Sequence, residues 1–183
     1  MARLSIDGYG QVELNNVAFR RDGRIEAQCA LDTAAFDSAT PCENGMILRV
    51  KKAEKKITFC DASAKNQLYA LNYSAEHMYD ERKPGLKNFK LDSAAVGEDF
   101  LPRVGYLAPG DLFTTNCVDL GAYASAAAVA TALASGDVFA AAGTQGAAVI
   151  QAAAPSAGLV MQVIKKTTMP DGQDAFQLQV LSV

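Results

Sequence analysis

Alternation of apolar and polar residues predicts short strands in the first third of the chain. Residues 11–20 alternate except for a slip at Asn15-Asn16, which indicates a turn or bulge. Residues 25–31 follow with a partly alternating pattern. Two apolar runs, Met46–Val50 and Ile57–Cys60, flank a charged stretch and predict a hairpin with a charged tip.

The second half of the chain continues this pattern. Leu68–Tyr73 and Val104–Leu107 are further strand candidates. The clearest element is a C-terminal hairpin, because two alternating runs, Leu159–Thr168 and Ala175–Leu181, are joined by Pro170-Asp171-Gly172, a typical turn sequence.

One segment reads as a helix. Ala122–Ala134 is dominated by alanine, the best helix former. Asp119 is a candidate cap for its start, and Gly136 lies just past its end.

The phrase Leu-Ala-x-Gly-Asp-[Leu/Val]-Phe occurs twice, at residues 107–113 and 133–139. Glycine permits the backbone dihedrals of a tight turn, and aspartate can accept hydrogen bonds from nearby amides. Each phrase therefore predicts a turn that leads into a strand. Two copies do not distinguish an internal repeat from convergent turn chemistry.

These elements predict a mainly β fold, a small β-barrel or β-sandwich with one alanine-rich helix, with an α+β arrangement as the alternative. We expect an N-terminal β portion over residues 1–67 and a C-terminal β-rich domain over residues 68–183 that contains the helix at about 122–134. The length of 183 residues also fits a single domain.

Composition indicates a globular protein, since 50% of the residues are hydrophobic and 20% are charged. The net charge of −3 argues against a dedicated nucleic-acid binder. The first residues lack the apolar core of a signal peptide, and no apolar run is long enough to span a membrane. We therefore expect a protein made in the cytoplasm, without nucleic-acid or membrane partners.

The charges are unevenly distributed. Between Leu112 and Ile164 only Asp119 and Asp137 are charged. Depletion of charge is typical of a core and of an interface. This segment is therefore either mostly buried within the fold or covered by another chain.

A basic cluster lies at the predicted hairpin tip, where Arg49 accompanies four lysines between residues 51 and 56. It is either an anion or nucleic-acid patch or a solvated hairpin end that protects an edge strand. No aromatic residue lies between the lysines, which favours the solvated hairpin end.

No metal or cofactor site is expected. Cys29, Cys42, Cys60 and Cys117 form no CxxC pair, and we interpret them as small buried hydrophobic residues in a reduced compartment. His77 is the single histidine, and we interpret it as a surface residue.

No catalytic residue is expected either. The chain has no phosphate-binding glycine loop, no GxSxG elbow and no HExxH helix. The sequence thus favours a binding or structural role over an enzyme.

Two segments resemble small structural proteins of tailed-bacteriophage heads. The first is Arg103-Val104-Gly105-Tyr106-Leu107 with the following Gly110–Asn116, and the second is the closing run Lys-Lys-Thr-Thr-Met-Pro-Asp-Gly-Gln-Asp from Lys165, which an alanine-rich stretch precedes. The resemblance is one of layout over residues 68–183, and it is to capsid decoration (cement, or auxiliary head) proteins.

The resemblance implies a β-rich virion protein without cofactors, made in the host cytoplasm, that binds the major capsid protein on the outer surface of the shell as a homotrimer. The segment between Leu112 and Ile164 is then the candidate subunit contact. Residues 1–10 are either a capsid-binding arm or a first edge strand.

Other functions stay open at this stage. One is a tail or head–tail completion component. Another is a carbohydrate-binding virion module, which would need exposed aromatic side chains on one face. The tyrosines available for such a face are Tyr69, Tyr73, Tyr79 and Tyr106.

Overall fold

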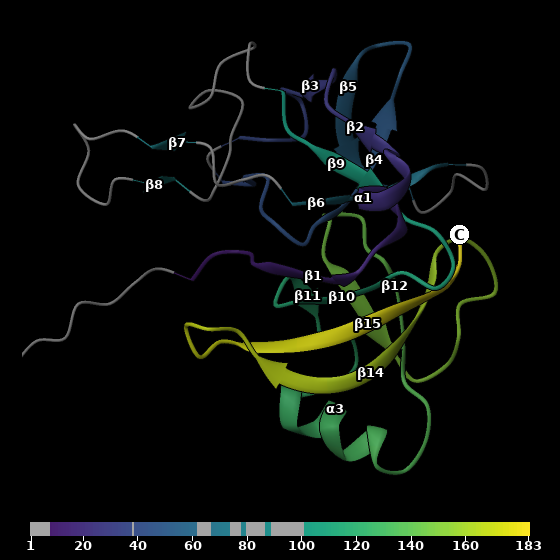
Figure 1. Cartoon of the computed structure of the whole chain (residues 1–183). Coiled ribbons are helices and arrows are strands. Elements are labelled where there is room, and N and C mark those ends of the chain that lie inside the picture. Colours follow the sequence, from purple (N-terminus) through teal and green to yellow (C-terminus); the bar gives the residue numbers. More distant parts are fainter. Residues whose placement is uncertain (1–7, 38, 62–66, 74–77, 80–86, 89–100) are drawn as a thin grey trace, which may run out of the picture.

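The computed structural model describes residues 8–37, 39–61, 67–73, 78–79, 87–88 and 101–183, and strands predominate among them (Figure 1). The expectation of a mainly β fold is confirmed. Two mixed sheets stay open instead of closing into a barrel, so the barrel form is not found. We call the larger one sheet A and the other sheet B.

Sheet A has seven strands within the described chain, in the order β1-β10-β15-β14-β12-β13-β11. Its pairs are antiparallel except for the parallel pair β11 and β13. The strands are β1 (Val12–Asn16), β10 (Leu112–Thr115), β11 (Val118–Asp119), β12 (Phe139–Ala142), β13 (Ala148–Gln151), β14 (Val160–Thr168) and β15 (Asp174–Ser182).

Sheet B has six strands in the same described ranges, in the order β2-β9-β6-β4-β5-β3, and β3 runs parallel to β5. A separate short pair joins β7 (Met78–Tyr79) to β8 (Lys87–Asn88). The strands of sheet B are β2 (Ile25–Glu26), β3 (Ala30–Leu31), β4 (Ile47–Lys51), β5 (Lys56–Phe59), β6 (Tyr69–Asn72) and β9 (Val104–Tyr106).

Sheet B is buried on both faces. Ile47 and Leu71 are cross-strand partners and join a core that also contains residues of sheet A, such as Phe113. Leu48 and Ala70 are the next pair, on the opposite face, and they join a second core. That core is completed by side chains from the segment before β4: Cys29, Leu31, Phe36 and Cys42.

Both predicted hairpins are confirmed. β4 and β5 pair in antiparallel register across the charged tip, and β14 and β15 form the C-terminal hairpin. The slip at Asn15-Asn16 corresponds to a register shift in β1, between Glu13 and Asn16. The expected strand over residues 25–31 is two short strands, β2 and β3.

The expectation of a strand up to residue 20 is wrong, because Ala18–Asp22 forms the short helix α1. Gly23 ends α1 in the left-handed conformation, with φ of 69°. The backbone N–H of Ala18 donates to the carboxylate of Asp111 at 2.6 Å. An acceptor remote in sequence therefore pairs with a backbone N–H in the first turn of α1, which has no partner within the helix. The local alternation of residues does not indicate such a partner.

The alanine-rich helix, α3, spans Ala126–Leu133, a shorter range than the expected 122–134, and packs against β14 (Figure 1). Ser125 caps it by accepting a hydrogen bond from the N–H of Ala128 at 3.2 Å. Asp119 was the expected cap but instead accepts from the N–H of Gly121, because its carboxylate is used in the turn after β11.

The two Gly-Asp phrases both precede strands, β10 and β12, as expected, but their turns differ. Gly110 has a left-handed φ of 92°. Asp111 beside it is 2% exposed and accepts hydrogen bonds from the N–H groups of Ala108 and Ala18. Gly136 instead donates to the carbonyl of Ala132 at the end of α3, and Asp137 is exposed. The structure therefore favours convergent turn chemistry.

The expected boundary at residues 67 and 68 does not coincide with the division between the sheets. β6 and β9 complete sheet B, although they follow the boundary. β1 lies before the boundary in the sequence, but it pairs with β10 in sheet A. The reason is that the neighbours in both sheets are remote in sequence, and a core shared by both sheets lies between them.

Candidate functional site

The basic cluster at the β4–β5 tip is paired with acidic side chains. Lys52 lies 3.3 Å from the carboxylate of Glu26 and 5.4 Å from the centre of the Tyr106 ring. Lys51 and Lys56 lie 3.8 and 3.3 Å from the carboxylate of Asp32. This pairing favours the interpretation of the tip as a solvated hairpin end and disfavours the interpretation as an anion-binding patch.

The two acids of this cluster are buried near their lysines. Burial by itself raises the pKa of Glu26, but hydrogen bonds from the Gln28 N–H and from Lys52 outweigh it, so the pKa lies below its ordinary value. The pKa of Asp32 is lowered in the same way, by the Ala34 N–H and Lys56 against the effect of burial. Both groups are therefore held as carboxylates.

The tyrosines do not share a face. Tyr106 is the cross-strand partner of Ala70 and packs against the second core. Tyr69 neighbours Ala70 along β6, so it points to the opposite face, where it joins the core shared with sheet A. Tyr73 also packs against that shared core, with its ring 5.4 Å from that of Phe19. The side chain of Tyr79 lies outside the described residues.

The four cysteines are free thiols. Cys29, Cys42 and Cys60 are buried, as interpreted, and Cys117 is half-buried. Burial raises the pKa of Cys60 and of Cys117 to about 12, so neither is a thiolate nucleophile at neutral pH. No cluster of three metal-ligating side chains occurs in the described ranges. His77 lies outside them.

The charge-poor segment contributes both to the core and to the surface. Val129, Val138, Ala140 and Ile150 are buried. The exposed positions from residue 119 to residue 157 carry uncharged side chains, mostly alanine, serine and threonine, apart from Asp119 and Asp137. We call these exposed side chains the neutral surface: Ala122, Ala124, Ser125, Ala127, Thr131, Ala134, Ser135, Thr144, Gln145, Ala152, Ala153, Ala154, Ser156 and Ala157.

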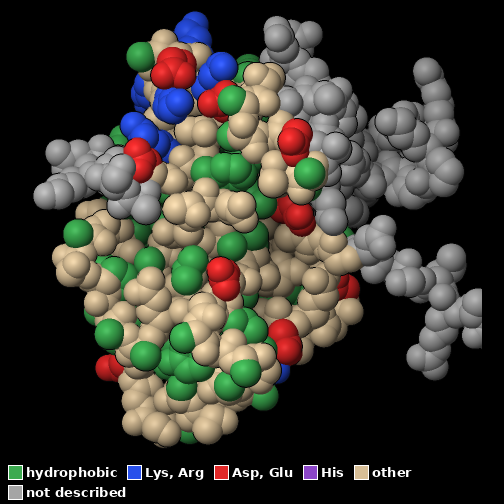
Figure 2. Space-filling view, turned by 180° about the vertical axis from the view of Figure 1, so that it is seen from behind, with side chains coloured by type: hydrophobic (Ala, Val, Ile, Leu, Met, Phe, Trp, Pro, Cys, Tyr) green, Lys and Arg blue, Asp and Glu red, His purple; other side chains and the backbone are tan. Residues whose placement is uncertain are grey.

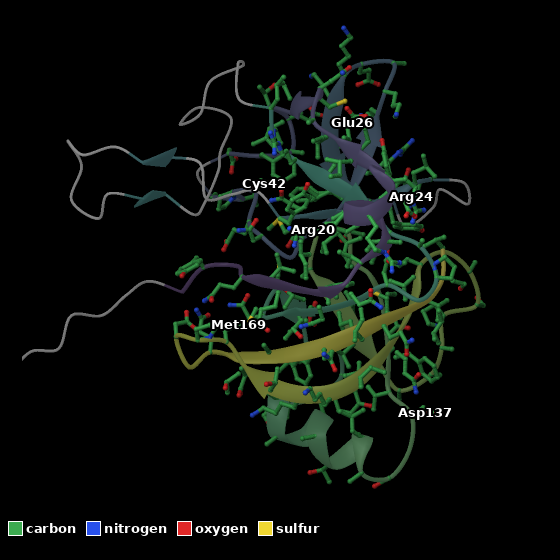
Figure 3. All side chains as sticks on the ribbon, in the orientation of Figure 1. Arg20, Arg24, Glu26, Cys42, Asp137 and Met169 are labelled. Atoms are coloured by element: carbon green, nitrogen blue, oxygen red, sulfur yellow. The ribbon has the colours of Figure 1, made fainter. Side chains whose placement is uncertain are left out.

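The part of the neutral surface on α3 and the lysine cluster lie at different ends of the molecule, whereas the β12–β13 turn lies beside β4 and Ala157 lies at the junction of the two sheets. In Figure 2 the blue side chains gather at the end that carries the β4–β5 hairpin, and the end that carries α3 is mostly green and tan. Glu26 and Asp137 mark these two ends in Figure 3.

The first described residues are attached to the end of sheet A. Asn116 accepts from the N–H of Gln11 at 2.6 Å and donates its amide to the carbonyl of Tyr9 at 2.9 Å. The N–H of Gly10 donates to the carboxylate of Glu43. Residues 8–11 are thus part of the fold, and residues 1–7 of the expected arm lie outside the described residues.

One cleft lies where the two sheets meet. It has a volume of about 260 Å³. Sheet B and the segments that flank β6 supply Cys60, Asp61, Gln67 and Tyr69, and the wall from sheet A consists of Ala141, Ala142, Gln151, Ala157, Gly158 and Leu159.

Gln67 organises the sheet B side of this cleft. Its amide accepts from the N–H of Asp61 at 3.1 Å and donates to the carbonyl of the same residue at 2.7 Å. It also donates to the hydroxyl of Tyr69 at 3.3 Å. The thiol of Cys60 donates to the carbonyl of Ile47. These contacts offer hydrogen-bonding groups and no activated nucleophile.

The cleft has no signature in the sequence. Its polar residues come from two regions that are far apart in the chain, and no motif links them. Of the described residues that line the cleft, Gly158 is the one whose type is required by its conformation and surroundings. Its φ of 80° suits glycine, and a Cβ there would lie 2.7 Å from the Tyr69 hydroxyl. A glycine between two strands nevertheless predicts a turn and no more.

No helix in the described part of the chain is long and apolar enough to cross a membrane. Comparisons with known proteins gave no match, whether to a family model, to a curated protein or to a solved structure.

Proposed function

We propose that this chain is a non-enzymatic structural protein of a tailed-phage virion, which binds the outer surface of the capsid as a homotrimer and stabilises the shell. The observation that carries the proposal is the neutral surface around α3. The cores of protein interfaces are depleted of charge, and that surface is exposed yet almost uncharged. The resemblance over residues 68–183 supplies the class of assembly.

The placement of the neutral surface suits a subunit contact. Its α3 part lies at one end of the molecule, while the lysine pairs with Glu26 and Asp32 lie at the other end. A cyclic trimer repeats one head-to-tail contact that joins two different flanks of each subunit. Three copies held together bind a capsid more strongly than one, because the second and third engagements are intramolecular.

The test has two parts. Light scattering behind a sizing column should give three times the chain mass of 19.3 kDa. The purified chain should also co-sediment with DNA-filled heads, stripped of this protein, of the phage whose genome encodes it, and raise the temperature at which those heads release their DNA. A monomer that does not sediment with the heads would contradict the proposal.

A matched pair of variants locates the contact. Ala127→Glu places a charge on the exposed side of α3, and we expect it to shift the mass to that of a monomer, because a buried unpaired charge is costly. Gln28→Glu adds the same charge at an exposed position next to sheet B and should leave the trimer intact. Equal effects of the two variants would exclude α3 from the contact.

A further inference from the structure

One residue that lines the cleft between the sheets, Tyr69, carries a hydroxyl that can make a further hydrogen bond. Tyr69 is 8% exposed and lines the cleft. Its hydroxyl oxygen accepts from Gln67, and among the described residues no acceptor for the hydroxyl hydrogen is found. The hydroxyl can therefore donate its hydrogen to a ligand oxygen in the cleft.

The opposite wall adds complementary groups. Gln151 lines the cleft from β13, and its amide makes no hydrogen bond within the described chain. This amide supplies both donors and an acceptor. Asp61 adds carboxylate oxygens, and the guanidinium of Arg49 lies 3.9 Å away, so the charge of the carboxylate is compensated. The cleft therefore offers donors and acceptors without net charge.

An aromatic side chain, Phe139, does not line the cleft itself but lies next to two residues of its sheet A wall. Phe139 is the cross-strand partner of Gln151, and Ala141 lies two residues further along β12 on the same face. Both of these neighbours line the cleft. Phe139 is half-buried and packs against neither core of the described residues. Its ring is thus available to an apolar ligand face.

We propose that this cleft binds one ring of a neutral sugar, with the ring hydroxyls on Tyr69, Gln151 and Asp61 and the apolar C–H face toward Phe139. Each sugar hydroxyl is both a donor and an acceptor, which matches a wall that presents both. The volume of about 260 Å³ is below the range of roughly 300–1,000 Å³ for sites of drug-sized ligands, and it suits one ring. The proposal does not depend on the virion role.

The test is a titration followed by NMR of the side-chain amides, with the methyl glycosides of glucose, galactose, mannose and N-acetylglucosamine as probes. At least one probe should move the Gln151 and Gln67 amide signals in a saturable way and leave that of Gln145, in the β12–β13 turn, in place. Gln151→Ala and Phe139→Leu should each weaken binding of that probe by about tenfold, which is about 1.4 kcal/mol.

A second pair of variants separates the cleft from its surroundings. Ala157 is exposed and lines the cleft, so Ala157→Leu should fill it and abolish binding without disturbing the core. Ala154 is exposed in the same loop but does not line the cleft, so Ala154→Leu should bind normally. The proposal is overturned if no probe moves the two amides, if Ala154→Leu weakens binding as much as Ala157→Leu, or if the shifts follow protein concentration instead of sugar, which would mean a second copy occupies the cleft.

Discussion

The two ends of this molecule differ in the chemistry of their exposed side chains. At the sheet B end, lysines of the β4–β5 hairpin pair with the buried carboxylates of Glu26 and Asp32. At the end with α3, the exposed side chains are mostly alanine, serine and threonine. Charged, solvated side chains resist association, whereas a neutral surface permits it. This difference is the basis of our proposal that the α3 end meets another chain.

The two ends also differ in how their cores are built. Sheet B lies between two cores, and one of them is closed by the segment before β4, through contacts such as Phe36 with Phe59 at 4.6 Å between ring centres. Sheet A contributes to the shared core, to which α3 adds Ala126 and Val129. α1 lies at the junction, since it follows β1 of sheet A and packs Phe19 on β9 of sheet B.

The largest loss of stability is expected where Asp111 joins the two regions. Asp111→Ala removes the acceptor of the Ala108 and Ala18 N–H groups, so two donors lose their partner, and unfolding should become easier by about 2–5 kcal/mol. Asp137 occupies the same place in the second Gly-Asp phrase but is exposed. Asp137→Ala should cost less than about 1 kcal/mol in urea unfolding. Similar losses in the two variants would remove Asp111 as the link between the regions.

A smaller loss is expected at Gly105, on the face of β9 that meets α1. A Cβ at this position would lie 2.2 Å from the ring of Phe19. Gly105→Ala should therefore destabilise the protein by about 1–3 kcal/mol, as overpacked cores do. Thermal unfolding measures the loss.

The control for this variant is Gly136→Ala, since no atom lies within 4 Å of the added methyl group and the backbone is not left-handed. It should be neutral. If Gly105→Ala is neutral as well, Phe19 does not hold α1 against sheet B. The double variant Gly105→Ala with Phe19→Leu should recover part of the loss, because the smaller side chain leaves room for the methyl group.

How far the sequence predicts this fold depends on whether the interactions are local. The β4–β5 and β14–β15 hairpins follow from alternation and turn residues, which act over a few positions. The sequence predicts a strand up to residue 20, because Val12, Leu14, Val17 and Phe19 alternate except for one slip. The helix depends on Asp111, which is 93 positions away. Such a partner leaves no local pattern.

The same distinction explains the sites. The charge-poor segment is visible in the sequence because it is contiguous. Which of its side chains are exposed is known only from the structure. The sugar cleft is not visible, because Tyr69 and Gln151 meet only when sheet B packs on sheet A. In the sequence the four tyrosines are candidates for one exposed aromatic face. Strand alternation then separated Tyr69 from Tyr106, which no composition count can show.

The smallest effect is expected from the ion pairs at the sheet B end. The pKa values of Glu26 and Asp32 are lowered from 4.5 and 3.8, so both carboxylates stabilise the folded chain above those values. This contribution is lost as the pH falls below those values toward the lowered pKa values of the folded state, because the unfolded state binds protons first. Glu26→Gln with Asp32→Asn should cost about 1 kcal/mol at pH 7, and the gap to the unaltered chain should narrow toward pH 3. Urea unfolding at a series of pH values measures this difference in unfolding free energy.

The control is Asp174→Asn, which breaks the Lys166–Asp174 pair on sheet A, where no such buried carboxylate is involved. Its loss of unfolding free energy should be smaller at pH 7. If the difference in unfolding free energy between the double variant and the unaltered chain stays constant from pH 7 to pH 3, these lysine pairs do not stabilise the fold. The contrast between the two ends would then concern only solubility and association.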